Sequence, residues 1–245
     1  MFMNQYDLIE TVQKIKKQKY PQAKVIFLAG SVVRREHTPY SDLDLVVVYD
    51  DIPNAWRESF LYEAWPVEAF VHDPTTLTYF FETDCKRGFP SIVNMVNEGI
   101  CVPSSTEFSK SLKQTAKHYL QKGPPPFTEE ELNHKRYAIT DLIDDLRAPR
   151  TRSEAIATGT LLYPLLADFW FRSQNQWSAK GKTIPRLLQK TNPEFAVLFE
   201  KSFQALFEKG DPTALIQVAT DILTPFGGFF FDGFLLKAPK DWRIS

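Results

Sequence analysis

Two short apolar segments that flank a polar stretch constrain this chain more than any other feature. The first, KVIFLAG at residues 24–30, ends in glycine, and the second, at residues 43–49, is rich in valine. Both segments have the length and bounds of buried β-strands. The polar stretch from Ser31 to Ser41 contains Pro39, which favours a turn with room for one helical turn. The pattern therefore predicts two buried strands joined through a turn.

The flanking sequence predicts a helix before these strands and further elements after them. Residues 4–19 place Leu8, Val12 and Ile15 on one helical face. Val67 to Val71 is expected to form a third strand, residues 75–99 a helical stretch that ends at Gly99, and residues 100–102 a short closing strand. The first part of the chain is thus an α/β domain that reaches to about residue 122.

Three consecutive prolines at 124–126 mark the best boundary, because prolines break helices and stiffen linkers. Beyond them Thr128 and Glu131 form a capping box, and Ser153 is expected to begin a second helix. Asn192 and Asp211 each precede a proline, as residues at helix starts do. The second part, residues 128–245, is predicted to be an all-helical bundle.

Composition excludes several classes of protein. Lysine plus arginine number 29 and aspartate plus glutamate 30, which gives a net charge of −1 and argues against duplex nucleic acid as a partner. The two cysteines form no CxxC pair, so neither a zinc site nor a disulfide framework is expected. No signal peptide or membrane span is expected either, so we predict a soluble cytoplasmic protein that does not engage a membrane.

Asp42 and Asp44 are the residues that carry the chemistry. Side chains two apart on a strand share a face, so both carboxylates point the same way while Leu43 points into the core. Two like charges held together are costly unless a cation lies between them. Gly30 and Ser31 end the preceding strand, where a glycine lets the backbone approach and cradle a phosphate. This combination suits Mg²⁺-dependent phosphoryl or nucleotidyl transfer.

A third carboxylate is expected to complete the set of metal ligands. Glu68 lies in the apolar strand VEAFV, where a charge without a partner is disfavoured. We expect it on the same side of the sheet as Asp42 and Asp44, close enough to share a cation. An exposed strand face is the alternative interpretation of Glu68.

Gly30-Ser31, ten intervening residues and then Asp42-Leu43-Asp44 resemble the signature of the DNA polymerase β-type nucleotidyltransferases. The helical second half is similar to the C-terminal bundle of the antibiotic nucleotidyltransferases of the kanamycin and streptomycin type. The resemblance rests on specific motif residues over 25–49. After residue 127 it rests only on the general helical character of the sequence. One departure concerns Arg34-Arg35, where many relatives have Arg-Gly.

The resemblance implies an α+β fold, with a small mixed-sheet nucleotidyltransferase domain at 1–122 and a helical acceptor-binding domain at 128–245. It implies two Mg²⁺ ions held by Asp42 and Asp44, with Glu68 as the best match to the third carboxylate. In the predicted reaction Glu68 ligates the second metal or serves as general base. ATP or another nucleoside triphosphate would be the donor, with adenylyl transfer favoured, and pyrophosphate the product.

The remaining candidate residues have weaker support. Ser41, next to the acidic pair, and Lys182, just before a late helix, are candidates for nucleotide binding, although a surface lysine is the simpler interpretation of Lys182. Asp141 and Asp144 are candidates for acceptor binding in the cleft between the domains, although they also fit a solvated helix face.

The predicted reaction moves a nucleoside monophosphate to a hydroxyl of a small-molecule acceptor. One alternative is a toxin–antitoxin-type module that modifies a protein or RNA partner. Another is a non-catalytic nucleotide-binding relative, against which the intact carboxylate pair argues. The sequence identifies neither the acceptor nor the oligomeric state.

Overall fold

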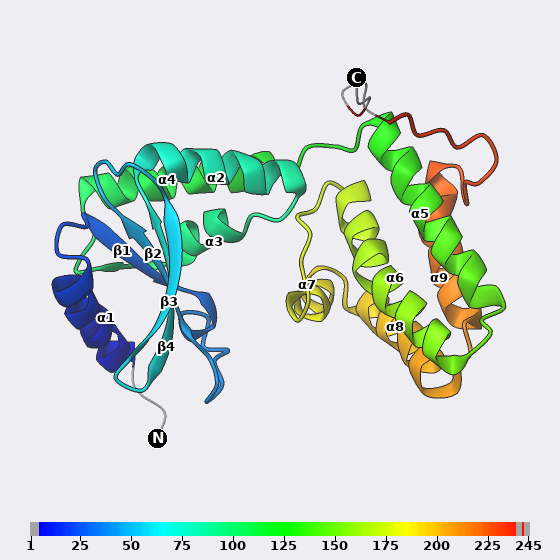
Figure 1. Ribbon diagram of the computed structural model, residues 1–245, viewed down its shortest axis with the longest axis horizontal. Coiled ribbons are helices and arrows are strands. Elements are labelled where there is room, and N and C mark those ends of the chain that lie inside the picture. The colour runs from blue at the N-terminus through cyan, green and yellow to red at the C-terminus, as the bar shows by residue number, and fades with distance from the viewer. Residues whose placement is uncertain (1–4, 239–241, 243–245) are drawn as a thin grey trace. The chain divides into compact units, whose positions relative to one another are not determined.

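The computed structural model describes residues 5–238 and 242, and the chain divides into two compact units, Met1–Pro124 and Pro125–Ser245. Each unit has a hydrophobic core of its own. The first unit contains a mixed sheet and the second is helical, so the predicted α+β class is confirmed (Figure 1).

The first unit is a five-stranded sheet covered by helices on both faces (Figure 1). Its elements in chain order are α1 (Gln5–Lys19), β1 (Val25–Ala29), the 3₁₀ turn η1 (Gly30–Val32), β2 (Leu43–Val48), β3 (Trp56–Tyr62), β4 (Trp65–His72), α2 (Pro74–Arg87), α3 (Ser91–Glu98), β5 (Ile100–Val102) and α4 (Glu107–Lys122).

The strand order is β3-β4-β2-β1-β5, and β2 and β4 are parallel while the other pairs are antiparallel. Side-chain alternation along β2 assigns each residue to one face. Leu43, Leu45 and Val47 are fully buried in the core that α1 covers, whereas Val46 and Val48 pack into the core beneath α2, α3 and α4. The buried runs KVIFLAG and LDLVVV are therefore interior strands, as predicted.

Two sequence predictions within this unit are corrected. Strand β3 was not predicted, and it forms the outer edge of the sheet beside β4. The helical stretch expected over residues 75–99 is two helices, because Gly88 ends α2 in the left-handed conformation with φ 80° and Pro90 follows directly before α3.

The second unit is built of helices, as predicted, with α5 and α6 packed along each other (Figure 1). The expected start at Ser153 is corrected, because Thr151 caps the helix by accepting a hydrogen bond from the Glu154 amide. None of the helices in the described residues is both long enough and apolar enough to span a membrane. The elements are α5 (Glu129–Arg147), α6 (Arg152–Ser173), α7 (Thr183–Thr191), α8 (Pro193–Gln204), the π turn η2 (Ala205–Lys209), α9 (Thr213–Leu223) and the 3₁₀ turn η3 (Thr224–Phe226).

Candidate active site

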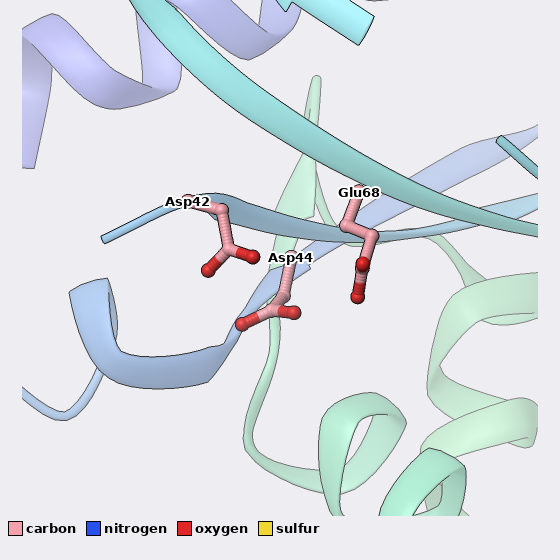
Figure 2. A group of neighbouring side chains, drawn as sticks. All are labelled: Asp42, Asp44 and Glu68. Carbon is pink, nitrogen blue, oxygen red and sulfur yellow. The ribbon is translucent and has the colours of Figure 1, made fainter. Parts of the chain in front are cut away.

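Three carboxylates meet on one face of the sheet in the first unit. Asp44 is the second residue of β2, and the parallel ladder sets it directly opposite Glu68 on β4. Asp42 stands one residue before β2 rather than on the strand, yet its side chain points the same way (Figure 2). One ligand oxygen from each of the three residues lies within 4.8 Å of the others. The structure thus brings together Asp42, Asp44 and Glu68.

The face that carries these acids follows from alternation along the strands. Asp44 has the same parity as Val46 and Val48, which pack beneath α2, α3 and α4. The three acids are only half-buried, so they lie where this face is still reached by solvent. A cation could therefore enter the group while the strands beneath it stay fixed by the buried core.

Gly30 lies against Asp44 and has two reasons to be glycine. Its φ of +75° is left-handed, a conformation that L side chains rarely adopt. A Cβ built on Gly30 would also lie 1.9 Å from the Asp44 Oδ2 atom. The chain can turn into η1 directly beside the carboxylates only because this residue has no side chain.

The connection from η1 to β2 is held by polar contacts within itself and by one ion pair to α3. The Ser41 hydroxyl accepts a hydrogen bond from the Thr38 amide at 2.9 Å. Arg34 forms ion pairs with Glu98 and, at 3.3 Å, with Glu36. Arg35 has a φ of 60°, so it adopts the left-handed conformation where many relatives have glycine. Arginine thus replaces glycine at position 35, but the backbone keeps a conformation that glycine favours.

Glu68 has a charged partner in this structure. Its Oε1 atom accepts a hydrogen bond from Nη2 of Arg57, which lies on the neighbouring strand β3. The Arg57 guanidinium also lies 5.0 Å from the centre of the Phe70 ring. The Glu68 side chain is 25% exposed.

A hollow of about 350 Å³ adjoins the acids on the β3–β4 side. Two of the acids form part of its wall, and apolar residues and one serine form the rest. Sequence reasoning missed both this hollow and Arg57, because both depend on the unpredicted strand β3. The residues that line it are Asp42, Ser59, Phe60, Leu61, Pro66, Val67 and Glu68.

The other candidate residues belong to the second unit. Lys182 is exposed where α7 begins. Asp141 and Asp144 are exposed on α5, and Asp144 accepts a hydrogen bond from Arg147 at 3.0 Å. Their proposed roles toward nucleotide and acceptor stay predictions.

The donor set of the acid group fits a divalent metal ion of the Mg²⁺ type. Carboxylate oxygens are hard ligands, and Mg²⁺ in phosphoryl-transfer sites is commonly held by one or two carboxylates together with substrate phosphates. Three carboxylates in one place also repel each other unless a cation offsets their charge. The close approach of η1 at Gly30 leaves backbone rather than a side chain beside that position.

The match to one protein family agrees with this geometry. The nucleotidyltransferase domain family matches residues 9–92, a segment that contains Gly30 and all three acids. No curated protein matches the chain. Among solved structures, a nucleotidyltransferase-like protein from Exiguobacterium sibiricum 255-15 is 14% identical, with a TM-score of 0.43 over 89% of this chain and 75% of that one. Residues 9–92 of the chain are thus identified as a nucleotidyltransferase domain.

Proposed function

We propose that the protein transfers a nucleoside monophosphate from a nucleoside triphosphate, with ATP favoured, to a hydroxyl of a small-molecule acceptor and releases pyrophosphate. The observation that carries the proposal is the group of three carboxylates within 4.8 Å of one another, beside a glycine turn. A net charge of −1 supports a small acceptor over a long nucleic acid.

In this proposal the three acids bind metal ions and the glycine turn binds phosphate. Asp42 and Asp44 hold two Mg²⁺ ions jointly, and Glu68 is the third ligand of one of them. When bound, such ions neutralise the triphosphate and stabilise the entering and leaving oxygens. The backbone at Gly30 and Ser31 receives the terminal phosphates, because a glycine turn lets phosphate oxygens reach backbone N–H groups.

The sheet order supports a direction for the reaction. Phosphoryl and nucleotidyl transfer place the entering and leaving oxygens roughly in line. Gly30 follows β1 on one side of β2, whereas β4 and β3 lie on the other side. If pyrophosphate leaves on the Gly30 side, the acceptor hydroxyl enters on the side of Glu68, where the hollow of about 350 Å³ lies.

Glu68 is then the residue next to the entering hydroxyl. A carboxylate within hydrogen-bond reach of that hydroxyl can take its proton, which contributes roughly 10²–10⁴-fold in rate. Of the seven residues that line the hollow, none is basic, and two are acids. The lining therefore favours an acceptor that is uncharged or cationic near its reacting hydroxyl.

The helical unit has the remaining roles in the proposal. We assign acceptor recognition to residues 128–245, with Asp141 and Asp144 as candidate contacts. Lys182 and Ser41 are assigned to the nucleotide. These assignments rest on the sequence pattern, and single alanine variants at Asp141, Asp144 and Lys182 test them through KM for acceptor and nucleotide.

The decisive experiment incubates the full-length protein with labelled nucleoside triphosphates, Mg²⁺ and a panel of hydroxyl compounds. We expect pyrophosphate release and a labelled nucleotidyl product. Asp42→Asn and Asp44→Asn should each lower turnover at least ~100-fold, because a neutral amide has no negative charge to offset the cation and holds it more weakly. Asp51→Asn is the matched control, since Asp51 is an exposed acid just after β2. Full turnover in Asp44→Asn with an unchanged circular dichroism spectrum would exclude the proposed metal site.

A further inference from the structure

The arginine that contacts Glu68 is placed to compete with a metal ion. Arg57 and Phe70 are paired across β3 and β4, and Ser59 is the residue paired with Glu68. By alternation, Arg57 therefore shares the acid face of the sheet and reaches Glu68 diagonally. Its side chain is 59% exposed, while that of Glu68 is 25% exposed. The carboxylate is thus fixed in its strand, and the guanidinium is the partner that can move.

The guanidinium of Arg57 and a divalent cation would compete for the carboxylate of Glu68. Glu68 contributes an oxygen to the group within 4.8 Å, and the same residue accepts the Arg57 hydrogen bond through Oε1. A metal ion at this position and the guanidinium carry charge of the same sign, so the presence of one weakens the binding of the other.

We propose that Arg57 is a resident counter-cation that positions Glu68 in the metal-free site and is exchanged for a metal ion when the site is loaded. This inference rests on the proposed metal-dependent function. It makes the two metal positions unequal: an ion held by Asp42 and Asp44 binds without displacing Arg57, and the ion that also needs Glu68 binds more weakly. Arg57 is a positioning residue, because it acts through Glu68.

The Phe70 ring can still contact the Arg57 guanidinium after it is released from Glu68. The distance from the Arg57 guanidinium carbon to the ring centre is 5.0 Å, within the range of a cation–π contact. Arg57 can therefore leave Glu68 without losing every favourable contact. It then remains beside Ser59 on β3, next to the hollow where the acceptor hydroxyl is proposed to enter.

The opposite face of the same strand provides a matched control. Lys19 forms an ion pair with Glu58 at 2.8 Å, and its ammonium lies 4.7 Å from the centre of the Phe60 ring. This trio has the same composition as Arg57, Glu68 and Phe70: a cation, a carboxylate and a phenylalanine. Lys19 and Glu58 lie on the α1 face, away from the acid group, because Glu58 pairs with Ala69 of the α1 core.

The experiment is a Mn²⁺ titration of the full-length protein without nucleotide, followed by electron paramagnetic resonance of the free ion. Arg57→Gln should tighten the weaker site about fivefold, the size expected for a partly exposed ion pair. Arg57→Lys should stay within about twofold of the wild type. Lys19→Gln removes the same charge on the other face and should leave both affinities unchanged. In Glu68→Gln the weaker site should be lost, and adding Arg57→Gln should no longer tighten binding.

A gain in affinity separates this role from a structural one, because damage to the fold would weaken binding. Unchanged or weaker Mn²⁺ binding in folded Arg57→Gln, with two sites present in the wild type, would overturn the exchange. Absence of Mn²⁺ binding in the wild type, or unchanged binding in Asp44→Asn, would instead overturn the metal site and with it the proposed function. In nuclear magnetic resonance, the Arg57 Nε–Hε signal, identified by its loss in Arg57→Lys, should shift on Mg²⁺ addition and stay in place in Asp44→Asn.

Discussion

Gly30 is the residue at which backbone conformation and site chemistry meet most closely. Replacement by alanine puts a methyl group where the Asp44 carboxylate lies, since the Cβ position is 1.9 Å from Oδ2. Alanine at φ +75° also costs about 1–2 kcal/mol of backbone strain. We therefore expect Gly30→Ala to lose stability and, in addition, at least ~10-fold in Mn²⁺ affinity.

A second glycine separates these two effects. Gly228 has a φ of +73°, and nothing lies within 4 Å of its Cβ position. Gly228→Ala should therefore carry the same backbone strain as Gly30→Ala, without the clash and without a change in Mn²⁺ affinity. Equal Mn²⁺ affinities for the two alanine variants would show that the close approach of Gly30 to Asp44 is not needed for binding.

His72 makes the stability of the first unit depend on pH. It is 3% exposed, and burial lowers its pKa from 6.5 to about 4, although the nearby Asp73 opposes the shift. As the pH falls, His72 is protonated near pH 6.5 in the unfolded chain but only near pH 4 in the folded chain. The contribution of neutral His72 to the free energy of unfolding is therefore fully present above pH 6.5 and declines as the pH falls toward 4.

Removing the imidazole should flatten this pH dependence. Between pH 7 and pH 5, His72→Leu should lose about 2 kcal/mol less unfolding free energy than the wild type. Urea unfolding at the two pH values measures the difference. His118→Leu is the control, because His118 is exposed. An equal decline in His72→Leu and the wild type would contradict the assignment to His72.

At the scale of elements, sequence patterns predicted the interior strands and the short edge strand β5 but missed the other edge strand, β3. Strand β1 is buried along its length and β2 is buried except at Asp44, so their apolar runs are visible in the sequence. Strand β3 is half-exposed and shows no clean alternation of apolar residues. Its turn into β4 has Glu63 at φ 53°, where hairpin patterns lead one to expect glycine, asparagine or aspartate.

The same distinction explains how much of the site could be foreseen. Asp42 and Asp44 were predictable because side chains two residues apart share a strand face, and Gly30 because it ends the preceding apolar run. The diagonal contact between Arg57 and Glu68 was not, because it depends on the register of β3 against β4. Local spacing predicts which side chains share a face, and only the pairing of strands shows which of them touch.

At the scale of the whole molecule, the two units should respond separately to changes in their cores. Phe199 is fully buried in the core of the helical unit, which shares no residue with the two cores around the sheet. Phe199→Ala should lower the stability of that unit by about 3–5 kcal/mol. Mn²⁺ affinity, measured at a temperature where the wild type is folded, should stay within about twofold because the acids lie on the sheet.

Calorimetry of the full-length protein, together with the Mn²⁺ titration, measures both effects. Phe27→Ala is the counterpart, since Phe27 is fully buried beneath α2, α3 and α4 in the first unit. That variant should weaken Mn²⁺ binding when the first unit unfolds. Parallel loss of Mn²⁺ binding in the two variants would mean that the units unfold as one.

The parallel ladder between β2 and β4 also determines where this chain can tolerate a change of length. Residues 49–55 connect β2 to the edge strand, so an extra residue there lengthens a loop and leaves Asp44 opposite Glu68. An extra residue between Trp65 and Glu68 would instead turn the Glu68 side chain to the other face, into the core beneath α1. Insertions and deletions among homologues should therefore collect in the first segment and be absent from the second, whatever acceptor each homologue uses.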